Sequence, residues 1–157
     1  MMREKGVYDM SSSSKTVRFV ASHTNTFEAS SSDVWAVWSD VSKWHALDAG
    51  NGKATIQGPF APGSVVTLGL KGGDSVEVVL TSVQENEEFT DETTLPSGVV
   101  RTRHSMEQNG KNLILTYAVE AEIAEGEARA FDSGMWQNLI AGVPAQVDNV
   151  AALARAA

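Results

Sequence analysis

Two side chains in the second half of the chain are suited to proton transfer or to orienting a carbonyl group. His104 lies on the apolar face of an alternating segment, residues 99–108, and Tyr117 lies on the apolar face of another, residues 113–122. The dipeptide Asn109-Gly110 between them is typical of a tight hairpin, so both rings are expected on one face of paired strands. An imidazole and a phenol so placed could polarise a ketone and move a proton. His104 and Tyr117 are the candidate catalytic residues, although a lone histidine on an apolar face is more often a hydrogen-bonded core residue.

The tryptophans are a second feature, because an indole ring offers an apolar ligand a flat surface and one N–H donor. Trp35 is central in an amphipathic helical stretch and is assigned to core packing. Trp44 and Trp136 lie near the ends of predicted elements, where a cavity would meet solvent, and core packing is the alternative for both. The predicted ligand-binding residues are Trp38, Trp44, His45, Leu68, Leu70, Thr102, Trp136 and Ile140.

Other kinds of site lack a recognisable pattern. The histidines occur on different predicted elements without a metal-binding spacing, and the chain has no cysteine. The sequence has neither a G-x-S-x-G nucleophile motif nor a phosphate-binding glycine loop. We therefore predict no metal and no cofactor. The acidic stretch from Glu85 to Glu92 is interpreted as the solvated face of a strand.

Composition limits the partners and the location. The chain has 157 residues, of which 42% are hydrophobic, and a formal net charge of −8. A surface of that sign repels phosphate groups, so we predict no nucleic-acid partner. No apolar stretch is long enough for a transmembrane helix, so we also predict no insertion into a membrane. The first residues lack the apolar run of a signal peptide, and a cytoplasmic location is expected.

Two parts of the chain differ in character. Residues 1–15 contain a run of serines and few apolar side chains, so they are predicted to be a mobile leader, with either Met1 or Met10 as the true start. Residues 16–157 have ordinary globular composition and are predicted to form one domain.

The periodicity of the rest of the chain predicts a series of strands and then a helix. A strand over residues 17–27 leads to a pair of short helices within residues 34–47, interrupted near residues 39–42. Strand patterns then follow one another to residue 122, separated by turn formers. Helical spacing returns over residues 132–154, where Pro144 marks a kink or the true start of the helix. Consecutive strands without intervening helices favour an α+β fold with an antiparallel sheet.

Three passages carry a resemblance to a known family. The first contains A-S-S-S-D-V-W, ending at Trp35, and then D-V-S-K-W, ending at Trp44; the second is Pro62-Gly63-Ser64; the third is the hairpin from His104 to Tyr117 with the final helix. Here the chain resembles the START-like, Bet v 1-like helix-grip superfamily (SRPBCC), in its polyketide cyclase/dehydrase branch. The resemblance covers residues 17–153. It implies a curved antiparallel sheet wrapped around a long C-terminal helix, with two short helices after the first strand and a cavity between sheet and helix.

The resemblance also implies a function. We expect the chain to bind a small hydrophobic molecule, polyketide-like or lipid-like, in that cavity and, as an enzyme, to assist its cyclisation or dehydration. The alternative is a non-enzymatic ligand carrier, sensor or chaperone-contacting module with the same pocket. The sequence departs from many relatives at His45, where they carry a second aromatic residue, and this leaves the ligand open. A homodimer also stays open.

Overall fold

The computed structural model describes residues 15–156, so the predicted leader lies outside the described residues except for Lys15. Seven strands form one antiparallel sheet in the order β1-β7-β6-β5-β4-β3-β2. They are β1 (Thr16–Glu28), β2 (Asn51–Gln57), β3 (Val65–Leu70), β4 (Ser75–Gln84), β5 (Glu88–Leu95), β6 (Gly98–Asn109) and β7 (Asn112–Ala124). The predicted antiparallel sheet is confirmed.

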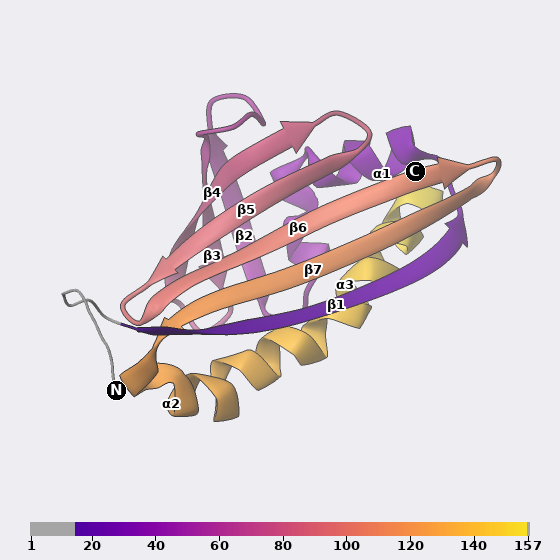
Figure 1. Ribbon diagram of the computed structural model, residues 1–157. Coiled ribbons are helices and arrows are strands. Elements are labelled where there is room, and N and C mark those ends of the chain that lie inside the picture. The colour runs from indigo at the N-terminus through magenta and orange to yellow at the C-terminus, as the bar shows by residue number, and fades with distance from the viewer. Residues whose placement is uncertain (1–14, 157) are drawn as a thin grey trace.

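The helices lie on the concave side of the curved sheet, and the longest of them runs along it (Figure 1). Two short helices, α1 (Ser31–Trp38) and η1 (Val41–Ala46), follow the first strand as predicted. After β7 come η2 (Glu125–Glu127), α2 (Ala128–Ser133) and α3 (Met135–Ala156). The predicted α+β helix-grip architecture is therefore confirmed. None of the helices in the described residues is long and apolar enough to cross a membrane.

The break between the two short helices is set by their capping residues. Ser30 begins α1 by accepting a hydrogen bond from the Asp33 backbone N–H at 3.2 Å. Asp40 begins η1 by accepting from the Ser42 backbone N–H at 3.1 Å. Because the backbone of Asp40 is extended, it separates the helices within the predicted interval. Trp38 and Trp44 are thereby placed on different elements.

The terminal helix is continuous through its proline. Gly134 ends α2, and α3 begins at Met135, so the predicted start near Asp132 falls in the short helix before it. Pro144 lies inside α3 and does not mark its start. With 22 residues, α3 has a length of about 33 Å. It can therefore run across much of the sheet.

The core lies between the concave face of the sheet and α3. Strand β7 alternates along its whole length, with Leu113, Leu115, Tyr117, Val119, Ala121 and Ile123 buried and their neighbours partly or fully exposed. Helix α3 buries Val143, Val147, Val150, Ala151 and Ala154 at helical spacing. Each fully buried valine, leucine or isoleucine side chain stabilises the fold by about 1.5–3 kcal/mol.

The hairpin predicted at Asn109-Gly110 fixes the register of the last two strands. Gly110 adopts a positive φ of 63°, a backbone conformation that residues other than glycine and asparagine rarely adopt. The turn pairs His104 with Tyr117, and the next pairing places Phe89 of β5 beside His104. Three rings thus lie on adjacent strands on the concave face.

Candidate functional site

A cavity of about 640 Å³ lies between the concave face of the sheet, the short helices and α3. This is within the usual range of small-molecule sites. Strands β3 to β7 form its walls, and α1, η1, the segment after η1 and α3 complete them. The lining residues are mainly apolar or aromatic and include Trp38, Trp44, Leu47, Leu68, Leu70, Val76, Val78, Phe89, Leu95, Val100 and Leu139.

Most of the predicted site residues are brought together on this cavity. His104, Tyr117, Trp38, Trp44, Leu68, Leu70 and Thr102 all line it. His45 does not, since its side chain is exposed and its Nδ1 lies 2.9 Å from the Ser42 carbonyl oxygen. It borders a separate shallow hollow beside β2.

The expected placement of Trp136 and Ile140 at the cavity is wrong. Trp136 is only 6% exposed, and its ring lies 5.4 Å from that of Phe19 on β1. Met135, Asn138 and Leu139 line the cavity instead. Those residues share one face of α3 at i, i+3 and i+4, whereas Trp136 and Ile140 lie on the adjacent face. The helical spacing was recognisable in the sequence, but the face turned toward the cavity was not.

Trp35, which was assigned to core packing, packs against the core but lies at its edge. Trp35 is only partly buried and packs edge-on against Phe60 and Trp38. The fully buried tryptophan of α1 is Trp38, at 0% exposed. The helix is therefore turned so that Trp38, and not Trp35, faces the centre of the molecule.

Tyr117 is held in the cavity wall as a hydrogen-bond donor. The Trp38 Nε1–H donates to the Tyr117 hydroxyl oxygen at 3.0 Å, and this leaves the phenolic proton available for another acceptor. Burial raises the pKa of Tyr117, so the phenol stays neutral at physiological pH. The ring is 1% exposed, and the position of its hydroxyl group is therefore fixed by packing.

His104 is a neutral member of an aromatic cluster. Its Nδ1 lies 3.2 Å from the Phe89 carbonyl oxygen, which can only accept, so Nδ1 carries the proton and Nε2 has the lone pair. Its ring stacks on that of Phe89, with centroids 3.9 Å apart and planes at 7°. Burial lowers the pKa of His104 to about 3. A nitrogen of that basicity is a poor general base at neutral pH.

Asp91 is a site residue that sequence reasoning missed. The stretch from Glu85 to Glu92 was interpreted as a solvated face, but β5 turns Asp91 toward the cavity with Phe89, Thr93 and Leu95. Asp91 keeps some accessible area because it borders the cavity. The surrounding protein raises its pKa to about 7 through desolvation. The alternation of Phe89, Asp91, Thr93 and Leu95 was the available signal.

Glu88 is a second exception within the acidic stretch. Its side chain is buried on the opposite face of β5, where it accepts hydrogen bonds from Ser82 Oγ and, at 3.1 Å, from Thr90 Oγ1. The Arg103 guanidinium is 3.6 Å from the same carboxylate. Glu88 is therefore a paired structural group, whereas Asp91 faces the cavity.

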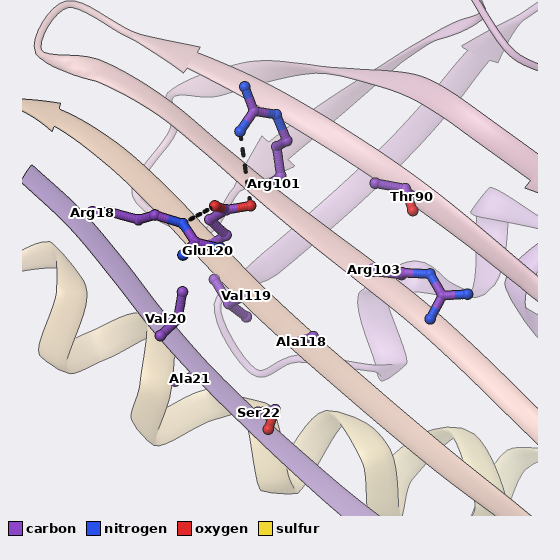
Figure 2. Close-up of a pocket in the computed structure, with 10 residues that line it drawn as sticks. All are labelled: Arg18, Val20, Ala21, Ser22, Thr90, Arg101, Arg103, Ala118, Val119 and Glu120. Carbon is purple, nitrogen blue, oxygen red and sulfur yellow. Dashed lines mark hydrogen bonds and ion pairs between the residues drawn. The ribbon is translucent and has the colours of Figure 1, made fainter. Parts of the chain in front are cut away.

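A second hollow, here called the convex hollow, lies on the opposite face of the sheet and is shown in Figure 2. Its lining residues are Arg18, Val20, Ala21, Ser22, Thr90, Arg101, Arg103, Ala118, Val119 and Glu120. Glu120 lies between Arg18 and Arg101 and pairs with both, while Arg101 also donates to Glu92 at 2.6 Å. Because its charges are already paired in solvent, we place the candidate site in the concave cavity.

Metal binding finds no support in the arrangement of side chains. Across residues 15–156, no group of three or more histidine, cysteine, aspartate or glutamate side chains is placed to hold a metal ion. The polar groups of the cavity can instead act as hydrogen-bond donors and acceptors, and Asp91 can also carry charge.

Comparisons with known proteins identify the fold. No family model and no curated protein matches the chain. Among solved structures, norcoclaurine synthase from Thalictrum flavum, a point mutant in complex with a transition state analogue, is 16% identical with a TM-score of 0.70; the match covers 89% of this chain and 96% of that one. The hypothetical protein jhp0584 from Helicobacter pylori is 13% identical with a TM-score of 0.71, covering 87% and 88%.

A third similar structure is the di-domain ARO/CYC StfQ from the steffimycin biosynthetic pathway. It is 11% identical with a TM-score of 0.68, and the match covers 87% of this chain and 51% of StfQ. Together with the sheet order and the long terminal helix, these similarities show that the chain has the Bet v 1-like helix-grip fold.

Proposed function

We propose that the chain binds a small, mostly apolar molecule in the concave cavity, where Tyr117 orients an oxygen of the ligand. The observation that carries this proposal is the hydrogen bond from Trp38 to Tyr117 on the wall of a 640 Å³ hollow. It fixes a phenolic donor on an otherwise aromatic surface. A carbonyl or hydroxyl oxygen can accept the free phenolic proton while the apolar body contacts Trp44, Leu68 and Val78.

In its enzymatic form the proposal is that the cavity assists a cyclisation or dehydration of the bound molecule. The similarity to a norcoclaurine synthase and to an ARO/CYC protein supports this form. The protein would supply shape, exclusion of water and the Tyr117 donor, with a carboxyl group nearby at Asp91.

A carrier without turnover is the second candidate, and the state of His104 favours it. The pKa of about 3 leaves the imidazole neutral, so the His104–Tyr117 pair has no strong base at neutral pH. Conversion would then need another base, such as Asp91, whereas binding alone needs none.

The binding proposal can be tested with a neutral fluorescent probe, N-phenyl-1-naphthylamine. We expect saturable binding at one site and a rise in melting temperature, because a ligand at a hundred times its Kd adds about 2.7 kcal/mol of stability. Thr102→Phe should weaken binding strongly, because Thr102 lines the cavity and the larger side chain would occupy part of it. Thr94→Phe makes the same change on the adjacent strand β5, at an exposed position, and should leave binding unchanged.

Failure of the probe to bind the native chain, or equal binding by Thr102→Phe, would overturn the proposal. Wild-type turnover of an aromatic polyketone that is lost in Tyr117→Phe would decide for the enzyme. Tight binding of that compound without product would decide for the carrier.

A further inference from the structure

Three oxygen-bearing side chains lie next to one another on the cavity wall. Asp91 and Thr93 are two residues apart on β5 and face the cavity together, and Thr102 of β6 is the direct cross-strand partner of Asp91. Residues paired in this way bring their side chains within contact distance. The wall therefore presents one carboxyl group and two hydroxyl groups at adjacent positions.

Among residues 15–156, the Asp91 carboxyl group has no polar partner of its own. Within the described part of the chain its side chain is in none of the hydrogen bonds or ion pairs, whereas Glu88, Glu92 and Glu120 on the convex face are all paired. A charged group removed from water without a partner is costly, and the raised pKa of Asp91 reflects that cost. A ligand that brings a positive charge would remove it.

The other ionisable groups around the cavity do not supply that charge. His104 and Tyr117 are neutral at physiological pH. Asp48 already accepts from Gln146 Nε2 at 2.6 Å and from the Gly50 backbone N–H at 2.8 Å. Lys71 is exposed and forms no ion pair with Asp91 among residues 15–156. Near neutral pH, Asp91 is the titrating group of the inner wall.

The rest of the cavity is also suited to a cation. Trp44 of η1 stacks with Phe89, and Phe89 stacks with its cross-strand neighbour His104; the face of an aromatic ring attracts an ammonium group. The formal charge of −8 on the whole chain draws cations toward it. A primary ammonium has three N–H donors, which matches the acceptors of Asp91, Thr93 and Thr102.

We propose that the cavity selects a small molecule with an apolar, aromatic body and a protonated amine, held by Asp91, Thr93 and Thr102. This inference rests on the proposed binding function and names its ligand class. The ammonium group donates to the carboxylate and the two hydroxyl groups. The aromatic body lies against Trp38, Trp44 and Phe89.

The test compares 2-naphthylmethylamine with 2-naphthylmethanol by isothermal titration calorimetry at pH 8. The two probes share the naphthylmethyl group, but only the amine carries a positive charge. We expect the amine to bind the native chain at least tenfold more tightly than the alcohol. Asp91→Asn should remove this preference while its affinity for the alcohol stays within about twofold, which also shows that the variant is folded. Glu92→Gln makes the same type of change at the adjacent residue on the convex face and should keep the preference.

Acidification provides a second measurement on the native chain. Between pH 8 and pH 6, protonation of a carboxyl group with a pKa of about 7 should weaken amine binding. The expected loss is about tenfold. Alcohol binding should change little, because the alcohol has no charge to pair with Asp91 and because His104 and Tyr117 remain neutral.

The possible results distinguish a failure of amine selection from a failure of the proposed binding function. Equal binding of the two probes, or a preference that survives in Asp91→Asn, would overturn amine selection while leaving apolar binding in place. Binding of neither probe would overturn amine selection, and if N-phenyl-1-naphthylamine also failed to bind, the proposed function would fail with it.

Discussion

The polar side chains on the concave and convex faces of the same strands differ in how they are paired. Along β6, Thr102 and His104 face the cavity while Arg101 and Arg103 face outward, and along β7 Tyr117 alternates with Glu120 in the same manner. Outward charges pair with one another across strands. Inward-facing polar groups are few and lie among aromatic rings, and in the described part of the chain the Asp91 carboxyl group has no partner. The charged groups of the convex face thus pair with one another, whereas the concave face has hydrogen-bond donors and acceptors left for a ligand.

The largest expected effect comes from removing the buried indole of the concave face. Trp38→Ala should lower the free energy of unfolding by about 3–5 kcal/mol, because it leaves a cavity in a packed cluster and deprives the Tyr117 hydroxyl group of its donor. Urea denaturation would measure this loss. Val20→Ala on the convex face, at a residue that is 61% exposed, is the control. It should change stability by less than about 0.5 kcal/mol. Similar losses in both variants would break the contrast between the faces.

A smaller effect with a distinct pH dependence is expected at Asp91. Its pKa is raised from 3.8 to about 7 in the folded chain, so between these values the folded state holds a proton that the unfolded state has released. The native chain therefore loses stability as pH rises from about 4 to 7. Asp91→Asn lacks this titration and should be more stable than the native chain at pH 8, by on the order of 1–4 kcal/mol.

Urea denaturation of both chains at a series of pH values would measure this difference. It should shrink as pH falls below 7 and level off only below about pH 3, where Asp91 is protonated in both states. A difference that does not depend on pH would show that the carboxyl group is not desolvated as described.

The smallest effect should come from the paired charges of the convex face. Glu120→Gln removes the carboxylate that lies between Arg18 and Arg101. Because these groups are exposed and screened, the expected loss is about 0.2–1 kcal/mol, and it should diminish in high salt. A loss as large as that of Trp38→Ala would show that the convex pairs are essential to the sheet.

The sequence predicted the faces of the strands better than the contents of the cavity. Alternation and the Asn109-Gly110 turn were enough to place His104 and Tyr117 on the concave side, because strand geometry repeats every second residue. Helix α3 was harder, since a rotation of about 100° separates Met135 from Trp136 and only the packing decides which one faces the hollow. Asp91 was not recognised, because the acidic composition of its neighbours predicted a solvated face for the whole stretch.

The pairing of β1 with β7 has a consequence for how the chain folds as it is synthesised. Thr24 and Thr116, which meet across these strands, are 92 residues apart in sequence. A ribosome that adds about 5–20 residues per second would leave β1 without its sheet partner for roughly 5–20 s. During that time an alternating strand with Phe19 and Phe27 on one side must stay soluble. The polar residues of its other face, including Arg18, Ser22 and Thr24, therefore also protect the nascent chain from aggregation.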